Sequence, residues 1–254
     1  MFRGESGGLS NVPTEATLRK AVRACRTSRQ DGSSGRRAGK QLLDRISETV
    51  RGLIAGAGLS PLENAGRKYI LREFAATGRP PALVGLKDEM KLSSVSAARR
   101  IVARLNEADI VTKEGDRIIS SYPFSAEETR HRVVFQDGHE VYALCATDAL
   151  GIHFMLESPL AVHSRCPECE NEMTIRMKGG VIVSSDPGGI VQFVSDSGEC
   201  GCTAKTFCPY MNFFCSRAHA AAWRKRNPDL GKGELYSLRE TLKYGKEIFA
   251  SFLK

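Results

Sequence analysis

The chain has 254 residues, enough for one large or two small domains, and 41% of them are hydrophobic, which excludes a wholly disordered protein. The net charge is +8, but residues 1–40 hold nine Lys/Arg and three Asp/Glu and so carry +6 of it. The charge therefore predicts a basic, solvated N-terminal segment rather than a nucleic-acid-binding groove. No apolar run reaches the ~20 residues of a membrane span, and no secretory signal is visible. We expect a cytoplasmic protein without a membrane segment.

The chain is expected to begin with a flexible basic segment, residues 1–39, followed by a helical, winged-helix-like domain, residues 40–122. Helical spacing of apolar residues predicts one helix from Lys40 to Ala57 and another near 67–76. A short helix over 84–90 and a longer one capped by Ser93 or Ser94 come next. A hairpin over 110–119 then supplies the wing.

The longer helix of this domain exposes three arginines, Arg99, Arg100 and Arg104. A DNA recognition helix has this character. The other interpretation is a packing platform with solvated arginines. We favour the platform and do not expect DNA binding. The alternative function is a winged-helix metal or thiol sensor that uses a cysteine cluster as its switch.

The pattern of residues 123–254 predicts a second domain of antiparallel strands and helices, so the fold class is α+β. A hairpin is expected from Arg132–Phe135 and Glu140–Leu144, joined by Asp137-Gly138. The remaining elements are a helix over 147–156, strands over 173–177, 181–183 and 190–194, and helices over 216–226 and around 235–244.

Seven of the eight cysteines lie between Cys145 and Cys215. In a cytosolic protein this clustering indicates metal or thiol chemistry rather than disulfides. Asp148 follows Cys145 by three residues, and on a helical turn the two side chains share a face. The carboxyl group could then exchange a proton beside a sulfur nucleophile. A buried structural cysteine and a helix-capping aspartate would fit the same spacing.

Cys208 begins a Cys-Pro-Tyr sequence that resembles a dithiol redox motif, but Met211 stands where the second cysteine would be. If Cys208 is reactive, it needs a distant partner, and Cys145 is the natural candidate. Cys215 stands among apolar and aromatic residues and is predicted to be a core residue. We interpret three histidines as structural: His153, His163 and His219.

Two close cysteine pairs, Cys166 with Cys169 and Cys200 with Cys202, are separated by about thirty residues. Four soft thiolates in a closed tetrahedral set suit a structural zinc ion. Four reduced cysteines without metal are the alternative. A zinc deaminase is excluded, because Arg165 stands where its motif requires proline and no His-x-Glu accompanies it.

Taken together, these motifs resemble the organomercurial (alkylmercury) lyase family. The resemblance covers roughly residues 65–250. It is carried by Tyr142–Leu150 with its Cys-x-x-Asp, by Val162-His163-Ser164-Arg165-Cys166, and by Thr206-Phe207-Cys208 through Phe213-Phe214 to Trp223. One departure is Pro209, where the family often has a second cysteine.

The resemblance implies that Cys145, Cys208 and Asp148 cleave a carbon–mercury bond, and that Cys166 is structural. Mercury is soft, so two thiolates would bind it and weaken its bond to carbon. The carboxylic acid would protonate the leaving carbon. No organic cofactor is needed. The Hg(II) product, held by Cys145 and Cys208, would pass to cellular thiols or to a mercuric reductase.

Overall fold

The computed structural model describes residues 42–196, 204, 207–230 and 232–254. Helices and antiparallel strands are mixed along this part of the chain, which confirms the predicted α+β class. The predicted basic segment, residues 1–39, lies outside the described residues. Within the described part, no helix combines the length and the apolar character that crossing a membrane requires.

The first part of the described chain contains α2 (Leu42–Gly56), α3 (Pro61–Thr77), α4 (Leu83–Glu89), α5 (Val95–Glu107), β1 (Val111–Glu114) and β2 (Arg117–Ser121). Capping residues explain the helix ends. Ser60 and Glu63 form a reciprocal capping box at the start of α3, and Gly78 ends it at φ 72°. Ser94 caps α5. The predicted helices and hairpin are therefore present, while their classification as a winged helix stays a prediction.

The larger sheet continues through β3 (Phe124–Ser125), β4 (His131–Phe135), β5 (Glu140–Ala143), β6 (Leu160–Arg165), β7 (Glu172–Lys178) and β8 (Val181–Asp186). Its order is β1-β2-β3-β5-β4-β6-β7-β8, and each neighbouring pair is antiparallel. Ser121 of β2 pairs with Phe124 of β3, so the sheet runs across the predicted domain boundary at residues 122 and 123. That boundary stays a prediction.

The smaller sheet has the order β10-β9-β11 and is built from β9 (Val191–Ser195), β10 (Met211–Phe214) and β11 (Gly233–Ser237). A single-turn 3-10 helix, η1 (Cys208–Tyr210), leads directly into β10. Two helices complete this part of the fold, α8 (Arg217–Arg226) and α9 (Leu238–Phe249).

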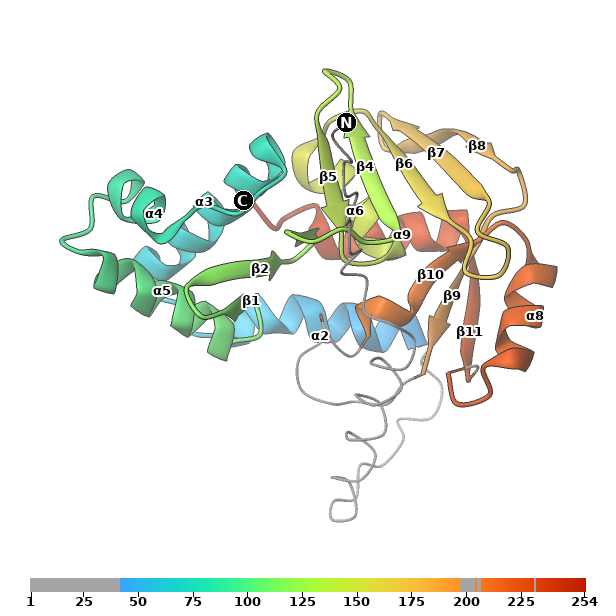
Figure 1. The fold of residues 1–254 in the computed structure, drawn as a ribbon, viewed down its shortest axis with the longest axis horizontal. Helices are drawn as coiled ribbons and strands as arrows, with labels where there is room; N and C mark the ends of the chain where they lie inside the picture. Colours follow the sequence, from blue (N-terminus) through green and yellow to red (C-terminus); the bar gives the residue numbers. More distant parts are fainter. Residues whose placement is uncertain (1–41, 197–203, 205–206, 231) are drawn as a thin grey trace, which may run out of the picture.

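Helix α6 (Ala146–Leu156) is the central element of the core. Every residue from Ala146 to Met155 is buried, and the helix packs against β4, β5 and α9. In Figure 1, α6 and α9 lie behind these strands. A helix without a polar face must be enclosed on all sides. Helix α6 is therefore enclosed by the strands and by α9.

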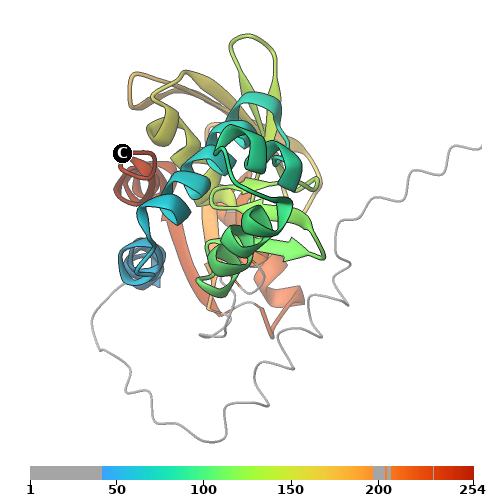
Figure 2. The ribbon, with the colours of Figure 1, turned by 90° about the vertical axis from the view of Figure 1, so that its left-hand side faces the viewer.

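The remaining elements lie around this core. In Figure 1, α3, α4, α5 and the β1–β2 hairpin form one end of the molecule, and β8 and α8 form the other. Figure 2, turned by 90°, shows α2 and α9 on the same side. The Tyr244 hydroxyl of α9 donates a hydrogen bond of 2.8 Å to Asp44 of α2, so the first described helix packs on the last.

The structure corrects the prediction of a helix around residues 235–244. Leu235 and Tyr236 lie in β11, paired with β9, and the helix begins at Leu238. Ser237 forms a capping box with Glu240, which sets the start of α9. Strands β3, β6 and β10 were also not predicted, because short apolar runs do not distinguish a strand from a buried helical segment.

Candidate active site

Cys145 stands between the end of β5 and the start of α6. Its backbone is extended, at φ −152° and ψ 176°, and its sulfur accepts the backbone N–H of Asp148 at 3.4 Å. Cys145 is therefore the N-cap of α6, a position usually held by a hydroxyl or carboxamide side chain. The thiol is directed over the first turn of the helix, toward the side chains that follow it.

Asp148 and Cys208 complete a compact trio with Cys145. Asp148 lies in the first turn of α6, and Cys208 opens η1, sixty residues further along. The Cys208 sulfur lies 3.7 Å from Asp148 Oδ2, and the two sulfurs and a carboxylate oxygen all lie within 4.8 Å of one another. The three side chains are buried, at 1%, 4% and 4% exposed for Cys145, Asp148 and Cys208.

Burial decides the protonation of this trio. Loss of solvation raises the pKa of the Asp148 carboxyl to about 7. Burial also raises the pKa of the Cys145 thiol. The pKa of Cys208 is raised well above its usual value, first by the hydrogen bond with Cys145 and then by burial. The free site thus holds two thiols and a carboxyl group that can give or take a proton near neutral pH.

A buried network holds the first turn of α6, and its members were not identified from the sequence. The Gln192 amide of β9 donates to Thr147 Oγ1 at 2.8 Å, and Thr241 of α9 donates to Gln192 Oε1 at 2.8 Å. Each of these side chains is buried. Thr147 precedes Asp148, so this network fixes the helix turn that carries the carboxyl group. No sequence spacing links these positions.

Cys208 is positioned from the other side by η1 and β10. Pro209 lies in the single turn, and the Asn212 side chain donates to the Pro209 carbonyl at 2.9 Å. β10 then pairs with β9, the strand that carries Gln192. The smaller sheet therefore positions both the turn that carries Cys208 and the hydrogen bonds of Gln192 that hold the first turn of α6.

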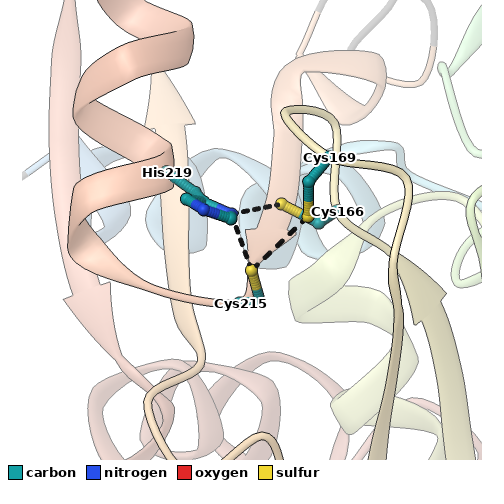
Figure 3. Close-up of side chains that lie close together, drawn as sticks. All are labelled: Cys166, Cys169, Cys215 and His219. Carbon is teal, nitrogen blue, oxygen red and sulfur yellow. Dashed lines mark hydrogen bonds between the residues drawn. The ribbon is translucent and has the colours of Figure 1, made fainter.

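A second group of sulfurs lies elsewhere. Cys166 and Cys169 of the β6–β7 loop meet Cys215 and His219 at the start of α8, with ligand atoms within 4.8 Å of one another (Figure 3). Cys215 is partly buried and packs against the hydrophobic core, as predicted, and its sulfur lies against His219. The other two cysteines of the predicted zinc set, Cys200 and Cys202, lie outside the described residues.

The exposed arginines of α5 are largely engaged within the protein. Arg99 makes a bidentate ion pair with Asp116 of the β1–β2 turn, at 2.8 and 2.6 Å. Arg104 donates to the carbonyl of Ala57. Two of the three arginines therefore make contacts within the protein, whereas the platform interpretation expected them to be simply solvated.

Comparison with known proteins decides the family. Residues 124–250, half of the chain, match the family model of MerB, alkylmercury lyase. The chain belongs to the alkylmercury lyase family. This confirms the family indicated by the sequence motifs, and the enzyme is a carbon–mercury lyase. The matched segment begins at β3 and contains both sulfur groups.

The fold of this lyase is similar to a crystal structure of the mercury-bound form of MerB2. The likeness has a TM-score of 0.67 at 22% sequence identity, and it covers 84% of this chain and 98% of the other. It therefore extends beyond the segment matched by the family model. No curated protein matches the lyase.

Proposed function

We propose that the lyase cleaves an organomercurial cation, R–Hg⁺, by protonolysis, with Cys145 and Cys208 as the mercury-binding thiols and Asp148 as the proton carrier. The observation that carries the proposal is the convergence of two sulfurs and one carboxyl group within 4.8 Å in a buried setting. Thiolates are the ligands that soft metals prefer, and a carboxyl group supplies the proton that carbon needs.

The first step is ligand exchange at one thiol. The sulfur bonds to mercury and its proton leaves to solvent or to the displaced ligand. Asp148 then takes the proton of the second thiol. The 3.7 Å contact between Cys208 Sγ and Asp148 Oδ2 supports this transfer, and so does the carboxyl pKa of about 7. The second thiolate can then attack the same mercury atom.

The second step breaks the carbon–mercury bond. With two thiolates bound, electron density on mercury weakens its bond to carbon, and the bonding pair leaves with R. Asp148 delivers to this carbon the proton it received, which gives RH and restores the carboxylate. The site now holds Hg(II) between two sulfurs. In sum, R–Hg⁺ and two enzyme thiols give RH, dithiolate-bound Hg(II) and one proton.

Two further thiols must remove the product. Each adds its sulfur to Hg(II) and returns a proton to an enzyme cysteine, so the resting dithiol is restored. We propose cellular thiols or a mercuric reductase as the acceptor, and the cytoplasm as the location, since thiols stay reduced there. The enzyme needs no organic cofactor for this chemistry.

The test is hydrocarbon release from phenylmercury in excess thiol, measured as benzene. Asp148→Asn keeps the size of the side chain but removes the acid. We expect it to bind phenylmercury and to release benzene at least ~10²-fold more slowly, the usual scale of a general-acid contribution. Cys145→Ser and Cys208→Ser should each abolish turnover, because a single thiolate binds mercury without completing the second attack.

Cys25→Ser is the matched control, since Cys25 precedes the segment that matches the lyase family. It should release benzene at the wild-type rate. Equal rates for Asp148→Asn and wild type would assign the proton to water or to a thiol. Turnover retained by either serine variant of the trio would refute the two-thiolate mechanism.

A further inference from the structure

The second sulfur group is assembled from two segments about fifty residues apart. Cys166 and Cys169 stand in the loop that joins β6 to β7, and Cys215 and His219 flank the start of α8. Figure 3 shows the three sulfurs and the imidazole pointing toward one another. His219 Nδ1 lies 2.8 Å from Cys215 Sγ and 3.9 Å from Cys166 Sγ, and Cys169 Sγ lies 3.7 Å from Cys215 Sγ.

The Cys166–Cys169 loop forms a tight turn around its sulfurs. The backbone N–H of Glu170 donates to the Cys166 carbonyl at 2.8 Å, and Glu170 takes a left-handed φ of 56°. The backbone N–H groups of Cys215, Glu168 and Cys169 also donate toward the Cys166 sulfur. Such donors orient a sulfur and stabilise its thiolate, as the outer shell of a metal site does.

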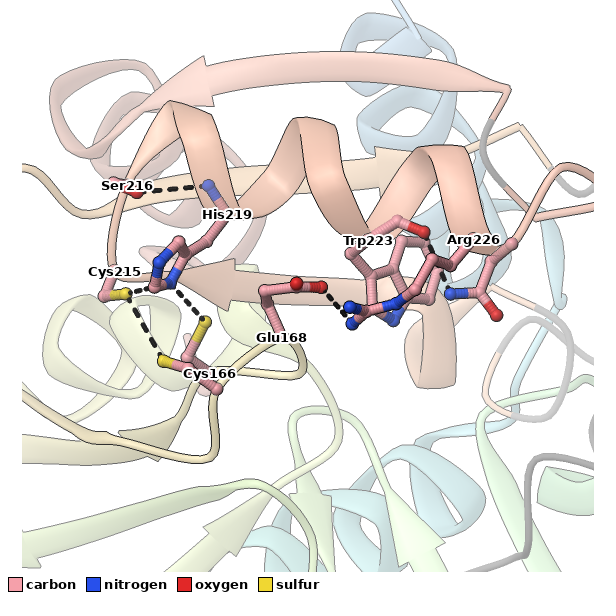
Figure 4. A network of polar contacts seen from close by, with 9 residues as sticks. Cys166, Glu168, Cys215, Ser216, His219, Trp223 and Arg226 are labelled. Carbon is pink, nitrogen blue, oxygen red and sulfur yellow. Dashed lines mark hydrogen bonds and ion pairs between the residues drawn. The ribbon is translucent and has the colours of Figure 1, made fainter.

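The start of α8 fixes the other two ligands. Ser216 is the N-cap and accepts the backbone N–H of His219 at 3.1 Å. His219 follows Cys215 by four residues, which brings the imidazole over the sulfur. Figure 4 shows both side chains on this turn, facing the Cys166 loop. The helix geometry therefore directs the imidazole to the sulfurs before any ligand is bound.

Ion pairs hold the loop against its neighbours. Glu168 pairs with Arg226 at the end of α8, a contact visible in Figure 4. Glu170 pairs with Arg130, next to β4, at 2.9 Å. Two ion pairs therefore hold the loop in place, and its two cysteines face α8.

The spacing of the ligands and the separation of two of the sulfurs match a tetrahedral zinc site. The pairs follow C-x2-C and C-x3-H, within the ligand spacings of structural zinc. A zinc–sulfur bond of about 2.3 Å places two tetrahedral sulfurs about 3.8 Å apart, close to the observed 3.7 Å. A disulfide would require about 2.05 Å.

We propose that Cys166, Cys169, Cys215 and His219 bind one structural zinc ion. Three thiolates and one imidazole fill all four positions of a tetrahedral ion, so no position is open for substrate. The site shares no ligand with the Cys145–Asp148–Cys208 trio. It joins the β6–β7 loop to α8 and to the end of β10, and the other end of β10 follows the Cys208 turn. The ion would therefore stabilise the position of β10, the strand that follows the Cys208 turn.

The experiment measures zinc in full-length, tag-free protein expressed with added zinc and purified without chelator. We expect about one zinc per chain by elemental analysis, the content of a single closed site. Cys169→Ser, Cys215→Ser and His219→Ala should each lose most of it. His219→Cys should retain it, since a fourth thiolate replaces the imidazole. This rescue separates lost coordination from general misfolding.

Two further measurements complete the test. The double variant Cys200→Ser/Cys202→Ser should keep its zinc. Loss of zinc there, with retention in Cys215→Ser, would instead establish the set of Cys166, Cys169, Cys200 and Cys202 and overturn the proposal. Cobalt in place of zinc should give the absorption of a tetrahedral, thiolate-bound ion. A wild-type protein that contains no zinc and takes up no cobalt would also overturn it.

Discussion

Asp148 is both buried and titratable, and burial disfavours the ionised form of its carboxyl group. Its carboxyl group is 4% exposed and faces the two thiols of the trio. Among the described residues, the contacts that favour its ionised form come from Cys145 and Cys208. Burial therefore dominates and raises its pKa to about 7. A proton carrier works best when its pKa lies near the working pH.

This raised pKa makes the stability of the protein depend on pH. Folding favours protonated Asp148, so its contribution is fully present below the unfolded pKa near 4 and is lost as pH rises through about 7. Asp148→Asn removes this dependence. From pH 4.5 to 8, we expect the variant to gain stability relative to wild type by up to about 3 kcal/mol, at about 1.4 kcal/mol per pKa unit. Urea unfolding of metal-free, reduced protein measures it, and parallel pH profiles would contradict it.

At the scale of elements, the close approach of α6 and α9 positions the active-site turn. Gly151 of α6 and Gly245 of α9 lie at the crossing, and a Cβ on Gly245 would come within 3.1 Å of the Gly151 backbone. A Cβ on Gly151 would lie 2.1 Å from Cδ2 of Phe249, a fully buried ring. A side chain larger than hydrogen therefore cannot be accommodated at Gly151 without displacing the buried Phe249 ring.

We expect Gly151→Ala to lower the free energy of unfolding by roughly 1–3 kcal/mol, because inserted methyl groups strain a packed core. Gly52→Ala is the matched control. Gly52 also lies within a helix, α2, but a Cβ there meets nothing within 4 Å. This change should be neutral or stabilise by up to about 1 kcal/mol. Denaturant unfolding compares the two, and equal effects would mean that the helix crossing tolerates a methyl group.

At the scale of the whole molecule, the two ends of the described chain stabilise each other. The backbone N–H groups of Leu42 and Leu43, at the start of α2, donate to the Glu234 carboxylate at 3.0 Å and the Tyr236 hydroxyl at 3.1 Å. These are N–H groups that a helix cannot satisfy by itself. Side chains of α2, among them Leu43 and Ile46, are buried. Helix α2 is therefore part of the lyase core although it precedes the matched family segment.

Two truncations distinguish the contribution of α2 to stability from that of the basic segment before it. Removing residues 1–36 should leave organomercurial cleavage and Tm unchanged, because that segment contributes charge and no candidate site residue. Removing residues 1–50 should lower Tm clearly, since it deletes most of the buried face of α2. Thermal unfolding and benzene release measure both. Loss of cleavage in the shorter truncation would assign the basic segment a role in catalysis.

The sequence by itself determined the local features of this lyase. Apolar periodicity and capping residues predicted most helices and the Asp137-Gly138 hairpin, because these depend on neighbours within a few positions. The Cys-x-x-Asp spacing likewise placed Cys145 and Asp148 on one turn, since i and i+3 are adjacent on any helix. The combination of motifs also identified the family, and the match over residues 124–250 confirms it.

Only the tertiary structure decided which distant residues meet. The family resemblance had implied that Cys208 acts with Asp148, and the pairing of β9 with β10 is what brings the two side chains together. The contact of Gln192 with Thr147 and the placement of Leu235 in a strand had no such signal in the sequence. The β6–β7 turn and the start of α8 joined Cys166 and Cys169 to Cys215 and His219, although the sequence had suggested Cys200 and Cys202. Each such contact depends on strand register and helix packing across the whole chain, which no local spacing encodes.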